Sequence, residues 1–309
     1  MFDLKQKNLE VLNVRDQLIK ENKNFGIKEL LKMPPYYDWV KCKVTDSDFF
    51  HMFLCGNDDG VAMRFFWNSA YEHCTLYLWN IIAKRVKKDF LILDIGAHTG
   101  SYSLAAKTAN KETTVVSIEP HIFNVARLIV NLKGNGLKTN NVVSGAISDV
   151  NGSKRFSIST KIDYLGSGGS LGEKNGALST NVNCYSLDSL IPSNNHDKIG
   201  LIKIDTEGHE VECLLGAHSI LNQSSPIIFF ECNTQKIISD LEKIFKSLDY
   251  VFFALDDLNF SCDYVEKLNV FYKNSEIDQH KVNRVAIKKN QLNWFKNILD
   301  NSPINSHYE

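Results

Sequence analysis

The sequence lacks the features that mark exported, membrane-spanning or zinc-clustered proteins. None of its seven cysteines lies near another at the spacing of a zinc knuckle or a redox dithiol. Residues 1–17 alternate charged with apolar residues and contain no apolar run of signal-peptide or membrane-spanning length. We therefore expect reduced thiols in a cytoplasmic protein that is not inserted into a membrane.

A charge excess is also missing. Lysine and arginine total 35 against 36 aspartates and glutamates, so the formal net charge of -1 gives no overall attraction to nucleic acid. The sequence contains no internal repeat and no low-complexity segment. What it does contain is 43% hydrophobic residues over 309 positions, enough for a full core in one large α/β domain with additions or in two modest domains.

Residues 1–70 are predicted to form an N-terminal cap or accessory region. Up to about residue 32 the apolar residues are spaced as in a surface helix, and Pro34-Pro35 ends that pattern. Residues 36–70 are aromatic-rich and irregular, with short strand-like runs such as 49–54. The C-terminal segment 276–309 is predicted to be an extension with a strand and a helix.

Between them, residues 71–275 alternate helices with strands. Amphipathic helices are predicted over 71–88, 101–109, 121–133, 209–221 and 235–248, and apolar strands over 90–96, 114–120, 141–149, 201–205, 226–232 and 251–256. Apolar strands separated by amphipathic helices indicate a parallel sheet covered on both faces. The predicted fold is therefore α/β, a doubly wound, Rossmann-like, mainly parallel sheet of about seven strands.

A glycine-containing turn follows the first of these strands. Asp94 ends the strand, and the turn Gly96-Ala97-His98-Thr99-Gly100 leads into a helix, where open α/β sheets receive ligands. Glycine allows the backbone to close over a ligand, and the helix N-terminus offers free N–H groups to an anionic part of it. Asp94 could accept hydrogen bonds from a cationic part.

An acidic residue ends the next strand. Glu119 lies 25 residues after Asp94, close to the roughly 20-residue spacing at which Rossmann proteins bind the hydroxyls of a ribose. A nicotinamide-dependent oxidoreductase is one reading of this pair. It is weakened because Gly96 and Gly100 are four apart and do not form the G-x-G-x-x-G fingerprint.

Three segments together resemble a known family: DIGAHTGSYSL at 94–104, VSIEP at 116–120 and LIKIDTEGHEVECLLGA at 201–217. They are similar to the FkbM-type family of class I methyltransferases that depend on S-adenosylmethionine (SAM), over about residues 90–235. The resemblance implies SAM as cofactor and O-methylation of a hydroxyl on a sugar, a glycan or a secondary metabolite. It also implies that Ser148 and Asp149 lie beside the adenine, although a polar turn is an equally good reading of this pair.

The catalytic residues are expected after the fourth strand of the sheet. A hydroxyl that attacks a methyl group needs a base or a metal ion to help remove its proton. Candidate bases are Asp205, Glu207 and His209, although acidic residues at a helix start can also be simple caps. Alternatively, Asp205 could join Glu231 and Asn233 as oxygen ligands of Mg²⁺.

Other features leave alternatives open. By the same resemblance Tyr71 and Glu72 would roof the cofactor pocket, or they would cap a helix. The glycine-rich stretch 166–172 fits a lid over the substrate or a plain loop. The expected partner is a small-molecule or glycan acceptor with a free hydroxyl, the sequence allows an oligomer, and a non-catalytic scaffold with a SAM-type fold is the remaining alternative.

Overall fold

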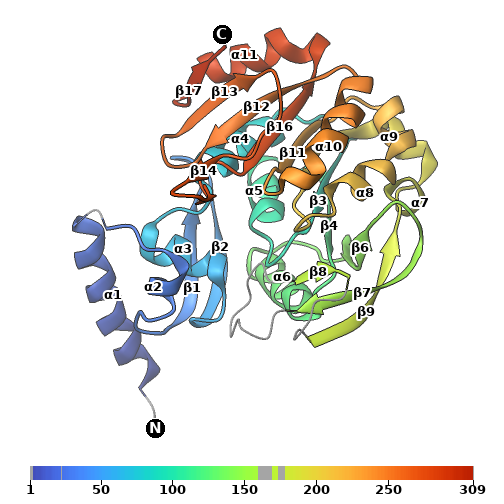
Figure 1. Ribbon diagram of the computed structural model, residues 1–309. Coiled ribbons are helices and arrows are strands. Elements are labelled where there is room, and N and C mark those ends of the chain that lie inside the picture. The colour runs from blue at the N-terminus through green and yellow to red at the C-terminus, as the bar shows by residue number, and fades with distance from the viewer. Residues whose placement is uncertain (1–2, 22, 159–168, 173–177, 309) are drawn as a thin grey trace.

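The computed structural model describes residues 3–21, 23–158, 169–172 and 178–308 (Figure 1). In these ranges the main sheet has nine strands in the order β17-β13-β12-β16-β11-β10-β3-β4-β5. Their bounds are β3 Leu91–Ile95, β4 Thr114–Glu119, β5 Val142–Ser144, β10 Ile199–Ile204, β11 Ile227–Glu231, β12 Tyr250–Asp256, β13 Ser261–Val265, β16 Asn283–Lys288 and β17 Asn305–His307. The doubly wound α/β fold predicted from the sequence is confirmed, with more strands than the seven expected.

Helices cover both faces of this sheet, as expected for parallel strands. One face carries α4 (His73–Ala83), α5 (Ser101–Ala109), α6 (Ile122–Gly134) and α11 (Leu292–Asp300), and the other carries α7 (Leu187–Leu190), α8 (Glu210–Leu215), α9 (His218–Gln223) and α10 (Gln235–Ser247). The helix predicted over 209–221 is divided between α8 and α9 at Gly216. A Cβ atom there would lie 2.0 Å from the carbonyl oxygen of Ser148, so this close approach of two backbones requires glycine.

Alternation along the strands decides which side chains face α5. Ile92, Leu201 and Phe229 belong to the core under α4 and α5, whereas Leu93 and Ile202 belong to the core on the opposite face. Because side chains alternate with a period of two, the ionisable residues that follow on the first face are Asp94, Lys203 and Glu231. Three ionisable side chains on adjacent strands therefore face the same helix layer.

The N-terminal unit is more regular than predicted. It consists of α1 (Leu4–Lys20), α2 (Ile27–Leu30), the antiparallel pair β1 (Tyr36–Lys43) and β2 (Phe49–Gly56), and α3 (Gly60–Asn68). Figure 1 shows it in blue beside the main sheet. Asn131 of α6 and Asn135, which follows this helix, accept hydrogen bonds from backbone N–H groups of β2, each at 2.8 Å. Its core is continuous with the core under α4 and α5.

A second sheet of four strands in the described residues was not anticipated. Its order is β6-β9-β7-β8, with β6 Ala146–Ile147, β7 Gly152–Ile158, β8 Gly169–Leu171 and β9 Leu178–Tyr185. The single strand predicted over 141–149 is interrupted at Gly145, after which β6 leaves the main sheet and pairs with β9. Residues 166–168 of the glycine-rich stretch lie outside the described residues.

The C-terminal segment contributes to the main sheet. Strand β16 lies between β11 and β12 and is antiparallel to both. Segment 276–309 therefore supplies an internal strand as well as α11 and β17. The remaining elements are the hairpin β14 (Tyr272–Lys273) and β15 (Glu276–Ile277) and the 3₁₀ turns Ser193–Lys198 and Lys289–Gln291. Among the helices described, none has the length and apolar character required to span a bilayer.

Candidate active site

A cavity of about 360 Å³ lies at the carboxyl edge of the main sheet. The chain continues from β3 to β4 and β5 on one side and returns to β10 and β11 on the other, so the strand order reverses between β3 and β10. Ligands of open α/β sheets bind at such a reversal. The cavity is lined by residues of the turns after β3, β4 and β10, and by residues of α3 and β8.

Gly96 lies where the turns after β3 and β10 touch. Its φ is 78°, and a Cβ atom would lie 1.8 Å from the carbonyl oxygen of Asp205. The backbone N–H of Asp205 also donates to the carbonyl of Ile95 at 3.0 Å. Glycine is therefore required here by the contact between two turns, a reason different from the closure over a ligand expected from the sequence.

The rest of the first turn is divided between the cavity and the interior. His98 lines the cavity, whereas Ala97 is 3% exposed and Gly100 packs on Leu128. Asp94 is 1% exposed and accepts a hydrogen bond from the Ser103 hydroxyl at 2.5 Å. Burial raises the pKa of Asp94 to about 6. Asp94 and the first turn of α5 thus lie beneath the cavity and are not among the described residues that line it.

Glu119 lines the cavity with a fixed carboxylate. It accepts hydrogen bonds from the backbone N–H groups of His98 at 2.9 Å and His121 at 2.8 Å. Burial raises its pKa, and these hydrogen bonds offset part of the rise. A carboxylate held in this way can still accept hydrogen bonds from a diol. Its predicted contact with a ribose stays a prediction.

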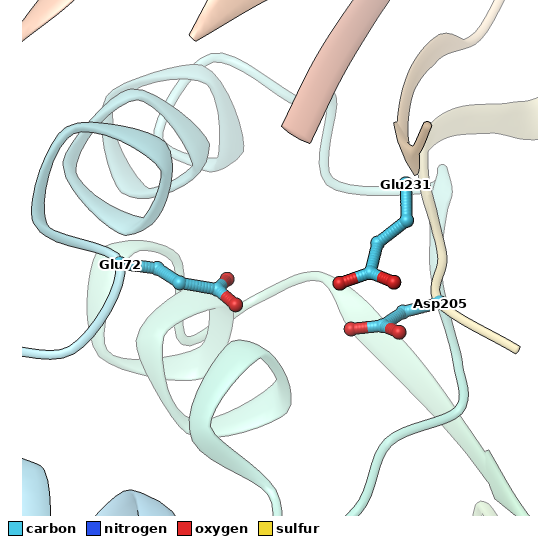
Figure 2. Close-up of side chains that lie close together, drawn as sticks. All are labelled: Glu72, Asp205 and Glu231. Atoms are coloured by element: carbon cyan, nitrogen blue, oxygen red, sulfur yellow. The ribbon is translucent and has the colours of Figure 1, made fainter. Parts of the chain in front are cut away.

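Three carboxylates lie close together beside the cavity. Figure 2 shows Glu72, from the N-terminal end of α4, pointing toward Asp205 and Glu231, which follow or end neighbouring strands. One oxygen of each lies within 4.8 Å of the others. Asp205 lines the cavity, and its side chain is 23% exposed. Tyr102 donates a hydrogen bond to Glu72.

A buried lysine balances part of this negative charge. The Lys203 ammonium lies 3.0 Å from a carboxylate oxygen of Asp205 and 4.8 Å from the centre of the Tyr102 ring. Burial lowers the pKa of Lys203, but attraction to Asp205, Glu72 and Glu231 outweighs burial and raises it. Burial and repulsion by Asp205 raise the pKa of Glu231 well above its usual value. Glu231 therefore tends to hold a proton, while Asp205 is paired with a cation.

The polar residues of the loop after Asp205 have two roles: some line the cavity, and one stabilises the loop. Glu207, with a φ of 55°, and His209 line the cavity. Glu210 is fully buried and accepts hydrogen bonds from the backbone N–H groups of Thr206 and Gly208 at 3.1 and 3.2 Å. Glu210 thus stabilises the loop that presents Glu207.

His209 is held on the side of β6. Its Nε2 lies 3.0 Å from the Ser148 hydroxyl and its Nδ1 lies 3.4 Å from Glu212, and burial lowers its pKa. Ser148 is fully buried and donates to Asp149 at 2.8 Å. Neither Ser148 nor Asp149 belongs to the described lining of the cavity, so their contact with adenine stays a prediction.

The proposed metal ligands are only partly brought together. Asp205 and Glu231 lie close to each other, and their third neighbour is Glu72. Asn233 uses its amide nitrogen to donate to Glu231 at 2.8 Å, and its oxygen accepts from Thr234 at 3.0 Å. Asn233 therefore acts as a hydrogen-bonding neighbour of Glu231 in this structure.

Sequence reasoning missed Lys203, Arg64 and Gln279. Lys203 had a readable signal, because a lysine within a continuously apolar parallel strand must be buried and needs a partner. Arg64 and Gln279, which line the cavity from α3 and from the segment before β16, carry no local motif. Tyr71 also lines the cavity, where the family resemblance places it.

Comparisons with known proteins identified similar solved structures and a matching family. Similar solved structures include an FkbM methyltransferase from Methylobacillus flagellatus, which is 14% identical, with 74% of this chain and 53% of that chain covered and a TM-score of 0.41. A SAM-dependent O-methyltransferase from Thermotoga maritima is 13% identical, with 68% of this chain and 64% of that chain covered and a TM-score of 0.36. A SAM-dependent methyltransferase from Agrobacterium tumefaciens is 8% identical, with 81% of this chain and 70% of that chain covered and a TM-score of 0.43. This chain spans about half the length of the Methylobacillus flagellatus protein.

The sequence itself gives the assignment. No curated protein matches it. The model of the methyltransferase FkbM domain matches residues 94–252, which include all three motifs quoted above. Because this match spans just over half of the 309 residues, the chain belongs to the FkbM methyltransferase family.

Proposed function

We propose that the protein transfers the methyl group of SAM to a hydroxyl of a sugar, a glycan or a secondary metabolite. SAM supplies an electrophilic methyl group on a positively charged sulfur. The observation that carries the proposal is Asp205, a carboxylate that lines the cavity beside Gly96 and is paired with buried Lys203. A hydroxyl acceptor needs such a base near the methyl group.

The lining of the cavity fits the parts of SAM. Ile118, Ala146 and Ile147 offer apolar walls for an adenine, next to the fixed carboxylate of Glu119 for a ribose. The lining also contains polar side chains, among them the Gln279 amide and the Tyr71 phenol, which lies near Glu72 and Asp205. Neutral donors and acceptors of this kind suit a hydroxyl-rich acceptor.

Asp205 is the proposed base. Lys203 pairs with its carboxylate at 3.0 Å, and the raised pKa of Glu231 reduces the negative charge of the cluster beside it. The proton of the acceptor hydroxyl would pass to Asp205 while the hydroxyl oxygen bonds to the methyl carbon, and the bond between that carbon and the sulfur would break to leave neutral S-adenosylhomocysteine. Glu207 is the second candidate. His209 is less favoured because both ring nitrogens already face Ser148 and Glu212.

A Mg²⁺ ion held by Asp205, Glu231 and Asn233 is the competing mechanism. The carboxylates could bind a divalent cation, but the ion would compete with Lys203 for Asp205 and with the proton on Glu231. We therefore propose a reaction without a metal. The ammonium of Lys203 would provide the charge balance that an ion would otherwise supply.

We also propose that the protein acts in the cytoplasm. All seven cysteines are free thiols, and six of them are buried, which suits a reducing compartment.

The test combines product analysis with a matched pair of variants. Labelled SAM is incubated with the protein and with candidate sugars and metabolite extracts, and products are identified by mass spectrometry. Asp205→Asn should bind S-adenosylhomocysteine like the wild type but lose roughly 100-fold or more in turnover. Asp240→Asn, an exposed residue of α10, is the control and should be fully active.

Three results would contradict the proposal. Full turnover by Asp205→Asn would remove this carboxylate from the chemistry. Tighter binding of NAD than of S-adenosylhomocysteine would favour an oxidoreductase. Failure of the wild type to bind S-adenosylhomocysteine would favour a scaffold with a methyltransferase fold.

A further inference from the structure

Arg64 brings a cation from the N-terminal unit into the wall of the cavity. Its guanidinium lies 5.8 Å from the centre of the Tyr71 ring, and one nitrogen donates to the carbonyl of Gly60 at 3.4 Å. Within the described ranges, no carboxylate forms an ion pair with Arg64. Because a guanidinium has five N–H donors, most of its hydrogen-bonding capacity remains for an anion in the cavity.

The other basic side chains near the cavity either face carboxylates or have a lowered pKa, because burial lowers the pKa values of His121 and His209. Lys203 is paired with Asp205. His98 lies close to the buried carboxyls of Asp59 and Glu119, where it offsets part of the rise in their pKa values that burial causes. Among the described residues that line the cavity, Arg64 is thus the cation whose charge remains available to a ligand.

The first turn of α5 is closed to a ligand. Ser101 is 4% exposed, Ser103 is fully buried, and the Ser103 hydroxyl donates to Asp94. The helix N-terminus and Asp94 were the sequence-based partners for the amino-acid part of SAM. Since the N-terminus of α5 and Asp94 both lie beneath the cavity, other groups must bind the charged parts of a ligand.

The position of Arg64 is fixed from two sides. Asp59 is fully buried and caps α3, because its carboxylate accepts from the backbone N–H groups of Val61 at 2.9 Å and Ala62 at 3.0 Å. The preceding residue, Asp58, forms an ion pair of 2.5 Å with Arg127 on α6. These contacts hold α3, and with it Arg64, against the layer that carries the cofactor turn.

We propose that Arg64 binds the carboxylate of the methionine part of SAM, so that the N-terminal unit completes the cofactor site. This inference rests on the proposed function, because it assigns one charged end of the same ligand. Arg64 and Asp205 both lie near Tyr71: Asp205 raises the pKa of the Tyr71 phenol, and Arg64 lowers it. A guanidinium can hold a carboxylate through two parallel charge-assisted hydrogen bonds, so Arg64 complements the carboxylate of this α-amino acid group.

Two ligands that differ only in this group test the proposal. S-adenosylhomocysteine has the amino-acid group, whereas 5′-methylthioadenosine keeps the adenosine and the thioether and lacks it. Both are titrated calorimetrically into the wild type, Arg64→Met and Arg64→Lys, with Arg85→Met as control because Arg85 is an exposed arginine of the turn after α4. Arg64→Met keeps a long apolar stem against Tyr71.

We expect Arg64→Met to weaken S-adenosylhomocysteine roughly 10- to 100-fold and to change methylthioadenosine affinity less than about 2-fold, the precision at which such affinities are compared. Arg64→Lys should lose less, because it keeps the charge, and Arg85→Met should bind both ligands normally. Wild-type affinity for methylthioadenosine also reports that a variant is folded.

Three outcomes would overturn the inference. Unchanged S-adenosylhomocysteine affinity in Arg64→Met would do so, and so would an equal loss for both ligands. A raised KM for the acceptor with unchanged S-adenosylhomocysteine affinity would assign Arg64 to an anionic acceptor instead. If the wild type bound neither ligand, the proposed function itself would fail, which is a separate result.

Discussion

The contact between the two ligand-binding turns makes Gly96→Ala the most informative single substitution. The added Cβ atom would lie 1.8 Å from the carbonyl oxygen of Asp205, and Cβ atoms essentially never approach other atoms within 3.0 Å. The two turns would therefore have to separate by more than 1 Å. Because the obstacle is backbone, no side-chain rotation can relieve it.

Two contributions set the expected cost. Alanine at a φ of 78° costs about 1–2 kcal/mol relative to glycine. Separation of the turns would also break the hydrogen bond from Asp205 N–H to the carbonyl of Ile95, which contributes about 1 kcal/mol. We therefore expect a loss of roughly 2–3 kcal/mol in the free energy of unfolding. Asp205 would also be displaced, so turnover should fall.

Gly136→Ala is the matched control. Its φ is 71°, close to that of Gly96, but a Cβ atom there has no neighbour within 4 Å. This variant should show only the conformational cost, about 1–2 kcal/mol. Urea denaturation of the wild type and both variants measures the difference. Equal losses in the two variants would refute the role of the contact with Asp205.

Three further predictions concern the same cavity. Glu119→Ala should weaken the binding of S-adenosylhomocysteine and of methylthioadenosine by similar amounts, about 1–3 kcal/mol each, because both ligands carry the ribose. A loss of affinity for only one of them in calorimetric titrations would contradict this prediction. Lys203→Met should leave the carboxylates around it without their cation and destabilise the protein by about 3–5 kcal/mol in urea denaturation; a stability equal to that of the wild type would show that Lys203 is not the counter-charge. Turnover should be unaffected by EDTA, and a loss that Mg²⁺ restores would support the metal mechanism.

The fold could be predicted because its strands are apolar throughout and its helices are amphipathic. The helix predicted over 101–109 matches α5, and the one over 121–133 matches α6 to within one residue. Tertiary contacts produced the differences. Gly145 and Gly216 each approach another backbone closely, and these approaches interrupt a strand and a helix that sequence periodicity would continue. A strand was predicted within 276–309, but its position between β11 and β12 was not, because that position depends on a long-range return of the chain.

The site could be predicted only where a motif covers it. Gly96, Glu119 and Asp205 all line the cavity, as their positions at strand ends suggested. The sequence predicts a strand end at Asp94 as well, yet it points toward α5 and bonds to Ser103. Asp94 lies inside β3 beneath α5, whereas Glu119 is the last residue of β4 and Asp205 follows β10. The packing of the helix over the strand is not visible in a local motif.

Several residues of the cavity lie outside the segment that matches the family, and this bears on the choice of acceptor. The family match begins at residue 94, whereas Arg64, Tyr71 and Glu72 come before it and Gln279 comes after it. These residues either line the cavity or point into the carboxylate cluster beside it. A domain that keeps the shared segment therefore keeps Glu119 and Asp205, while the flanking segments can change the shape and charge of the rest of the cavity. For this chain, exchange of Tyr71 or Gln279 should alter acceptor selection more readily than exchange within 94–252, where the same residues hold the turns together, whereas exchange of Arg64 should weaken the binding of the cofactor.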